Sequence, residues 1–199
     1  MTTVEAVLGT VLTYIGSALL YALIFLPIYG AARCVYLRKK CKNAPIDAKR
    51  ELLLAAFVLY LAGLASLTVL PGIGGIENYR IAFMADEIIF VPFTVLRKTF
   101  ENLKMGYYGL FFINFLGNIA VFMPVGFFVS KIFRVSLGRA VLIGLCISLF
   151  IELSQLFLVG RRTDVDDLWL NSLGAFVGGA IARLFENGRD VNTKPEPNK

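Results

Sequence analysis

Histidine is absent from this 199-residue chain, and cysteine, tryptophan and charged residues are scarce. Without histidine, a His-based catalytic triad and a His-ligated zinc site are both excluded. Three cysteines, Cys34, Cys41 and Cys146, make neither a disulfide framework nor a metal motif at these positions. We therefore expect no metal and no cofactor.

Positive charge is also missing from the N-terminal stretch "MTTVEAVLGT". A cleaved signal peptide begins with a positively charged region and ends at a small-residue cleavage site. Since the stretch has neither feature convincingly, we expect the first apolar run to be retained in the mature protein.

Apolar sequence is abundant: hydrophobic residues make up 57% of the chain, and the mean hydropathy is +0.72. A membrane-spanning helix needs about 20 predominantly apolar residues. The pattern predicts an all-α, polytopic membrane protein, a bundle of about five transmembrane helices. The apolar runs cover residues 4–32, 52–70, 109–130, 140–159 and 168–185.

The distribution of Lys and Arg predicts how the chain crosses the membrane. With the N-terminus outside, fourteen of the 20 basic residues fall on the cytoplasmic side and six on the other, as the positive-inside rule requires. We expect a multi-pass protein of the bacterial cytoplasmic (inner) membrane with its C-terminus inside. The net charge of +6 then reflects topology and anionic lipid, so no nucleic-acid partner is expected.

Three regions follow from this pattern. Residues 1–51 hold the N-terminal transmembrane helix and a basic cytoplasmic loop, residues 52–186 form a four-helix membrane core, and residues 187–199 are a polar tail predicted to be disordered. The one long loop is extracytoplasmic and amphipathic, with apolar residues among charges on either side of Pro92. It is predicted either to lie in the membrane interface or to pack onto the helix ends.

Polar side chains recur near the outer ends of the last three runs. Ser148, Glu152 and Gln155 are spaced i, i+4 and i+7, which places them on one helical face. If the helix continues to residue 159, Glu152 lies about 10 Å below its outer end.

The other two runs repeat this arrangement with i, i+4 pairs. Asn114 and Asn118 lie near the outer end of one run, and Asp167 and Asn171 near that of the next. The loop "GRRTDVDD" joins the last two runs outside. All of these groups are therefore predicted to converge on the extracytoplasmic half of the membrane.

An ionisable group within a membrane span usually marks a functional site. We predict an outward-facing polar pocket that binds a lipid headgroup or another amphiphile, with an arginine holding a phosphate in bidentate fashion. No catalytic residue is assigned, because no nucleophile lies clearly beside a base. The predicted pocket residues are Asn114, Asn118, Glu152, Gln155, Arg161, Arg162, Asp164, Asp167 and Asn171.

Several alternatives remain open. In a structural interpretation, Glu152 pairs with Arg161 or Arg162, Gln155 bonds a freed carbonyl, and the asparagines hold helices together. In an enzyme acting on a lipid-linked envelope substrate, Glu152 would be the acid or base; a lipid transporter is a further possibility. Carboxylates could also hold a hard cation, although "DVDD" matches no recognised loop. Those carboxylates are Glu152, Asp164, Asp166 and Asp167.

Small residues and a proline are assigned structural roles. Gly174 and Gly178 are one helical turn apart, and small residues at this spacing let helices approach closely. Pro124 and Gly126 lie inside the third run, where a proline frees a carbonyl and favours a kink or an unwound turn.

Taken together, "NFLGNIAVFMPVGFF" and "IELSQLFLVGRRTDVDDLWLNSLGAFVGG" resemble the VanZ-like family of small bacterial membrane proteins, over roughly residues 52–186. The step Pro92–Phe93 resembles a Pro-Phe step that the family tends to have in its outer loop. The residues that carry the pattern are Asn114, Gly117, Asn118, Phe122, Pro124, Gly126, Glu152, Gln155, an Arg of the 161/162 pair, Asp164, Asp167, Asn171, Gly174 and Gly178.

The resemblance implies resistance to lipophilic glycopeptide antibiotics such as teicoplanin. These drugs act at the outer membrane surface on the lipid-linked cell-wall precursor, which is the side where the polar groups are predicted to converge. The expected partners are therefore membrane lipids, the lipid-linked precursor or the antibiotic itself, and the oligomeric state is left open.

Overall fold

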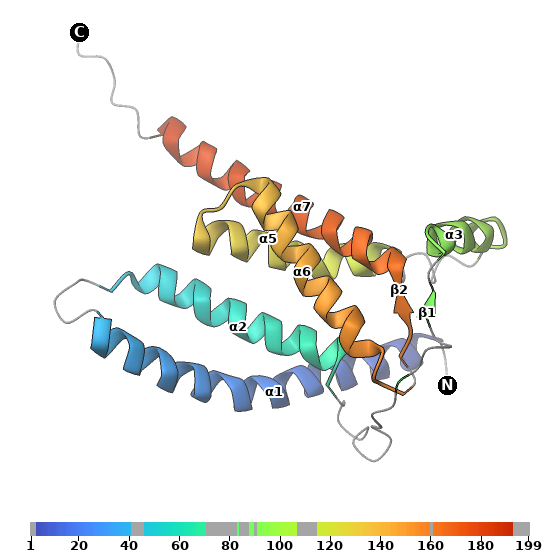
Figure 1. Cartoon of the computed structure of the whole chain (residues 1–199), viewed down its shortest axis with the longest axis horizontal. Coiled ribbons are helices and arrows are strands. Elements are labelled where there is room, and N and C mark those ends of the chain that lie inside the picture. Colours follow the sequence, from blue (N-terminus) through green and yellow to red (C-terminus); the bar gives the residue numbers. More distant parts are fainter. Residues whose placement is uncertain are drawn as a thin grey trace, which may run out of the picture. The chain divides into compact units, whose positions relative to one another are not determined.

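The computed structural model describes residues 3–40, 46–70, 83, 88–89, 91–106, 115–159 and 161–192. These residues are helical apart from short connections and one two-stranded sheet formed by β1 and β2 (Figure 1). In chain order the elements are α1 (Thr3–Lys40), α2 (Ala48–Thr68), β1 (Ile88–Ile89), α3 (Thr94–Lys104), α5 (Gly117–Phe133), α6 (Leu137–Gln155), β2 (Thr163–Asp164) and α7 (Val165–Asn192).

Four helices within the described ranges are long and apolar enough to cross a membrane: α1 over Ile15–Lys39, α2, α6, and α7 over Val165–Phe185. The third predicted run corresponds to α5, an apolar helix of 17 residues that follows a π-helical turn at residues 115–116. The prediction of an all-α, polytopic membrane protein is thereby confirmed.

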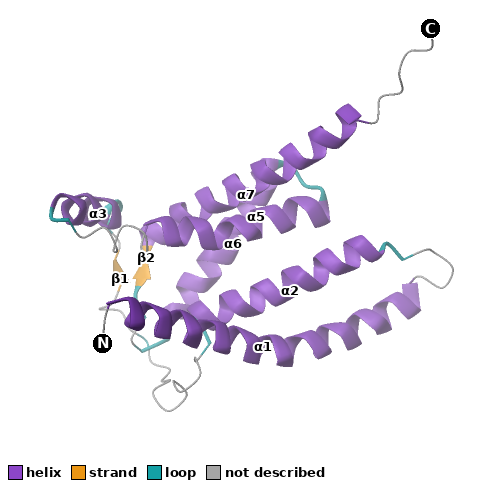
Figure 2. Ribbon diagram, turned by 180° about the vertical axis from the view of Figure 1, so that it is seen from behind, coloured by secondary structure: helices purple, strands orange, loops and turns teal. Residues whose placement is uncertain are grey.

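The described residues fall into two units. We call residues 1–88 and 153–163 the helical hairpin unit, because α1 and α2 lie side by side in it and run in opposite directions (Figures 1 and 2). We call residues 89–152 and 164–199 the three-helix unit, after α5, α6 and α7. Each unit is described by itself.

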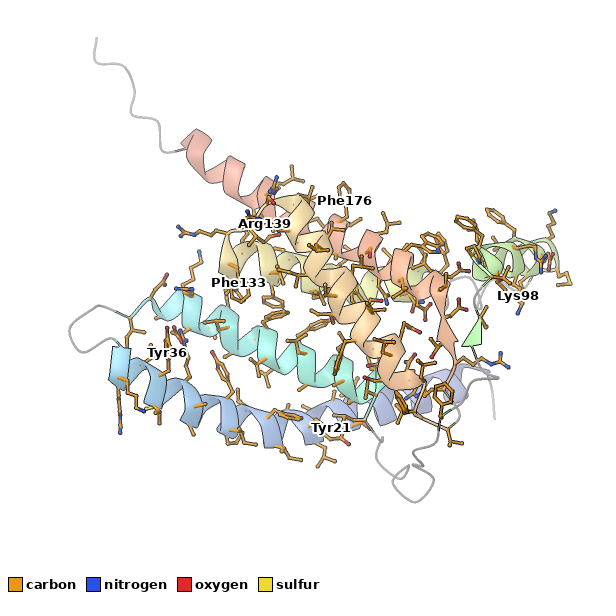
Figure 3. All side chains as sticks on the ribbon, viewed as in Figure 1. Tyr21, Tyr36, Lys98, Phe133, Arg139 and Phe176 are labelled. Carbon is orange, nitrogen blue, oxygen red and sulfur yellow. The ribbon has the colours of Figure 1, made fainter. Side chains whose placement is uncertain are left out.

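In the helical hairpin unit, α1 runs through Pro27 to Lys40, past residue 32, where the apolar run ends. Arg33 is therefore helical rather than part of the basic loop. Its guanidinium donates from Nε and Nη2 to the two carboxylate oxygens of Glu51, at 2.7 and 2.6 Å, and lies 4.8 Å from the ring centre of Tyr36. Figure 3 shows Tyr36 between α1 and α2. This ion pair ties the two helices together near the loop that joins them.

N-caps explain two helix starts that lie earlier than the apolar runs suggest. Asp47 precedes α2, and its Oδ1 accepts from the backbone N–H groups of Lys49 and Arg50 at 3.1 and 3.2 Å. Because an aspartate satisfies the free N–H groups of a first turn, the basic residues after it join the helix. The start of α7 at Val165, three residues before the apolar run, follows from the same kind of cap at Asp164.

In the three-helix unit, glycines allow α5 and α7 to pack backbone against backbone. A Cβ added to Gly174 would fall on the carbonyl of Ile119, and one added to Gly178 on that of Met123. On the facing helix, a Cβ at Gly126 would meet the Ala175 carbonyl. We call this contact the glycine seam. It is the close approach expected for small residues at one-turn spacing.

Helix α7 extends beyond the apolar run at its C-terminal end and ends at Asn192. Residues 193–199 lie outside the described residues, so the disordered tail predicted from residue 187 stays a prediction.

Candidate functional site: a polar cluster at the start of α7

The short strand β2 and the first turn of α7 are held by carboxylates. Asp164 Oδ1 accepts from the Asp166 backbone N–H at 2.9 Å, which caps α7. The Asp164 backbone N–H in turn donates to Glu152 Oε2 at 2.9 Å. Glu152 is only 4% exposed. The end of α6 is thus joined to the start of α7 through a buried carboxylate.

Asp166 connects α7 to the segment before α3. Its Oδ1 accepts from the Phe93 backbone N–H at 2.6 Å and from the Trp169 indole Nε1–H at 3.0 Å. Asp166 is fully buried, at 0% exposure. Phe93 has φ 62° and ψ 17°, a left-handed conformation that is unusual for a bulky residue, and its ring lies 6.0 Å from that of Trp169. The Pro92–Phe93 step is therefore anchored on the first turn of α7.

Two asparagines link α7 to its neighbours. Asn118 of α5 donates from Nδ2 to Asp167 Oδ1. Asn171 of α7 donates from Nδ2 to the hydroxyl of Ser148 in α6 at 2.8 Å. We define the polar cluster as Asn118, Ser148, Glu152, Asp164, Asp166, Asp167, Trp169 and Asn171.

The members of the polar cluster differ in accessibility. Its carboxylates at Glu152, Asp164 and Asp166 are buried, whereas Asn118 and Asp167 are only half-buried. Trp169 is half-buried as well, so the polar cluster has a buried part and a partly accessible part.

The structure places the predicted pocket residues in two groups. Asn118, Glu152, Asp164, Asp167 and Asn171 come together in the polar cluster. Asn114 lies outside the described residues. The remaining three, Gln155, Arg161 and Arg162, belong to the helical hairpin unit.

Within the helical hairpin unit, Gln155 Nε2 donates to the backbone carbonyl of Thr68 at 3.2 Å. Thr68 is the last residue of α2, and the final carbonyls of a helix have no partner inside it. Gln155 thus bonds a carbonyl at the end of α2, not one that Pro124 would free in the third run. Arg161 is half-buried and Arg162 exposed, and their role in a pocket stays a prediction.

The predicted depth of Glu152 needs correction. The apolar run continues to residue 159, but α6 ends at Gln155 and gives way to turns. Glu152 therefore lies in the last turn of α6, about 4–5 Å from its end at 1.5 Å per residue. Leu156 to Val159 are apolar, so hydropathy alone could not show that the helix stops before them.

Sequence reasoning missed three parts of the polar cluster: Asp166, Trp169 and the Phe93 backbone. Asp166 was considered only as a cation ligand, and the described residues contain no group of three or more His, Cys, Asp or Glu able to hold a metal ion. The spacing Asp166-x-x-Trp169 was the available signal, since residues three apart meet on a helix.

Burial raises the pKa of the Asp164 carboxyl above its ordinary value of 3.8, and the negative charge of Asp166 raises it further. The hydrogen bond from the Asp166 backbone N–H and the charge of Lys98 act in the opposite direction. Because the folded protein holds this proton more tightly than the unfolded chain, the stability contributed by Asp164 falls as the pH rises through the folded pKa.

We expect Asp164→Asn to be more stable than the natural protein at neutral pH. An asparagine keeps the oxygen that caps α7 but cannot ionise. The difference in melting temperature should shrink as the pH falls from neutral toward 3.8, below which the natural carboxyl is neutral in both states. Thermal unfolding in detergent across this pH range checks the prediction, with Glu101→Gln on the exposed side of α3 as a control. A difference independent of pH would contradict it.

Taken with the apolar helices, these features define a polytopic helical membrane protein with a polar cluster at one end of its spans. The family model VanZ/LLP1 matches residues 57–186, and the chain belongs to this family. Its matched region contains the whole polar cluster and the glycine seam. No curated protein and no solved structure matches the chain.

Proposed function

We propose that this VanZ-like protein binds a lipid headgroup or another amphiphile at an outward-facing polar pocket, and so contributes to resistance to lipophilic glycopeptide antibiotics of the teicoplanin type. It would act in the bacterial cytoplasmic membrane, with its N-terminus outside and its C-terminus inside. The observation that carries the proposal is the polar cluster, which gathers three buried carboxylates at the start of a membrane span.

Energetics favour a functional role for these acids over a purely structural one. Hydrogen bonds between transmembrane helices average only about 0.6 kcal/mol, whereas burying a carboxylate costs several kcal/mol. Glycine packing already joins α5 to α7. Helix association therefore does not require the buried carboxylates. Reversible binding of a ligand would explain why they are present.

The chemistry of the polar cluster suits a ligand rich in hydrogen-bond donors. Asp167 is half-buried and receives one side-chain hydrogen bond, from Asn118. Carboxylate oxygens accept from amines and hydroxyls, and a charge-assisted bond is about twice as strong as a neutral one. Lipid headgroups, the sugar–peptide part of the cell-wall precursor and glycopeptides all carry such donors.

An enzymatic role gains no support from the described residues. The hydroxyl of Ser148 accepts the Asn171 amide and is therefore engaged in joining α6 to α7. Glu152 accepts a backbone N–H at β2. With these hydrogen bonds, Ser148 and Glu152 are better suited to binding or structural support than to nucleophilic or acid–base catalysis.

The test is a paired susceptibility measurement in a sensitive Gram-positive host. We expect the natural chain to protect against teicoplanin but not against vancomycin, and Asp167→Asn to weaken that protection at matched membrane levels. Loss of one charge-assisted hydrogen bond is worth about 1.5–3 kcal/mol, or roughly a tenfold or greater loss in affinity.

Glu101→Gln is the matched control, since Glu101 is an exposed acid of α3 outside the polar cluster. It should protect as well as the natural chain. Absence of protection by the natural chain, with expression confirmed, would remove the resistance role. Equal protection by Asp167→Asn would move the binding site away from the polar cluster.

A further inference from the structure

Helix α3 separates its residues sharply by polarity. Leu96, Phe100 and Leu103 are spaced i, i+4 and i+7 and share one face. The opposite side carries Arg97, Lys98, Glu101 and Lys104, all exposed. At 11 residues, or about 16 Å, α3 is far too short to cross a membrane.

Some apolar side chains of α3, and of the segments next to it, are exposed. Phe100 is 56% exposed, Met105 63% and Val91 68%, whereas Thr99, on the neighbouring side of the helix, is buried. One flank of α3 is thus covered by protein, and the flank next to it presents the exposed ring of Phe100, while Val91 and Met105 are exposed just before and just after the helix. In a chain with spanning helices, such a surface at the end of a span meets lipid.

One hydrogen bond fixes the start of α3 at the level where the span of α7 begins. The Phe93 backbone N–H, at the N-cap of α3, binds Asp166 in the first turn of α7. Lys98 lies near enough to Asp164 for its charge to affect that carboxyl. Figures 1 and 2 both show α3 beside β2 and the start of α7, and Figure 3 labels Lys98 there. Because Val165 begins the apolar span, this level is the edge of the hydrocarbon.

The net charge of the polar side of α3 indicates which kind of membrane surface it would bind. Three cations and one anion give the polar side of α3 a net charge of +2. The Arg97–Glu101 contact, at 3.9 Å between exposed side chains, is too weak to neutralise the helix. An amphipathic helix with a basic polar face binds membrane surfaces that contain anionic lipids.

We propose that α3 lies in the membrane–water interface, with Phe100 and its apolar neighbours in the lipid and its basic residues on anionic phospholipid headgroups. The partner is thus the bilayer surface itself. This inference needs only the membrane location of α7 and does not depend on ligand binding at the polar cluster.

Electron paramagnetic resonance of a nitroxide at position 100 tests the inference. Phe100→Cys is made in a full-length chain whose Cys34, Cys41 and Cys146 are replaced by serine, and the protein is reconstituted in phosphatidylcholine vesicles with or without phosphatidylglycerol. We expect the label to be relaxed by oxygen and shielded from a water-soluble nickel chelate, about 5–10 Å below the headgroups. A label at Glu101→Cys should show the reverse.

Charge neutralisation tests the choice of lipid. Changing Arg97, Lys98 and Lys104 together to glutamine should move the position-100 label toward water in the anionic vesicles and have little effect in pure phosphatidylcholine. A matched triple change at the other end of the three-helix unit should leave the label where it is. The control residues are Arg134, Arg139 and Arg183.

Three results would overturn the proposal. Access of nickel to position 100 in both kinds of vesicle would place α3 in water. Shielding from both reagents would show that protein, such as a second copy of the chain, covers this surface. Identical behaviour of the two triple variants would remove the role of the α3 charges. If replacing Phe100 prevents folding, Val91→Cys provides a second labelled position, in the exposed segment that leads into α3.

Discussion

Gly178→Ala is expected to destabilise the protein by about 1–3 kcal/mol, the usual cost of adding a group to a tightly packed interior. The new Cβ would fall on the carbonyl of Met123, and backbone atoms cannot move aside as a flexible side chain can. The helices α5 and α7 must separate instead, which weakens the glycine seam along its length. Equilibrium unfolding in detergent micelles measures the loss.

Gly138→Ala is the control for this prediction. Gly138 lies at the start of α6, and an added Cβ there would meet nothing within 4 Å. Alanine is favoured over glycine in a helix by up to about 1 kcal/mol, so this variant should be slightly more stable. If the two substitutions had the same effect, the glycine seam would not be the reason for the glycine at position 178.

Asp166→Ala is expected to release α3 from α7. The substitution removes the acceptor for two donors, the Phe93 backbone N–H and the Trp169 indole, and an unpaired buried donor costs about 1–3 kcal/mol. Without this bond, the left-handed conformation of Phe93 loses one of its restraints and keeps the contact of its ring with Trp169. Trp169 is the sole tryptophan, so a red shift of its emission reports the change directly.

Trypsin provides a second measurement, because α3 carries Arg97, Lys98 and Lys104. Cleavage at these residues should accelerate in Asp166→Ala, while cleavage at Arg134 and Arg139, at the other end of the unit, should not. Asp166→Asn keeps an oxygen acceptor and should behave nearly as the natural protein does. Rapid cleavage of α3 in all three proteins would show that the Asp166 bond does not restrain it.

Much of the fold could be predicted because the bilayer simplifies the problem. Long apolar runs must become helices when they lie in lipid, since every backbone polar group needs a partner within the segment. Helix ends were less predictable. Asp47 and Asp164 start helices by local capping, which sequence signals can reveal, but α6 stops at Gln155 within apolar sequence.

The polar cluster was predicted where its residues follow helical spacing and missed where its contacts are distant in sequence. Asn118 and Glu152 stood out as polar residues in apolar runs, and Asp167 as an acid directly before one. The bond from Phe93 to Asp166 joins residues 73 positions apart, and its donor is a backbone group that no side-chain pattern reveals. The resemblance pointed to the Pro92–Phe93 step, but its role became visible only in the structure.

Because α7 follows α5 and α6 in the chain, it sets the order in which these three helices can pack together during synthesis. Glu152, Asn118 and Phe93 all find their hydrogen-bond partners on β2 and α7, and the glycines facing α5 are there too. Until the ribosome has released α7, α5 and α6 can enter the bilayer, but the hydrogen bonds of Asn118 and Phe93 and the glycine seam cannot form. A chain without α7 would therefore leave open the surface of α5 that the glycines of α7 cover.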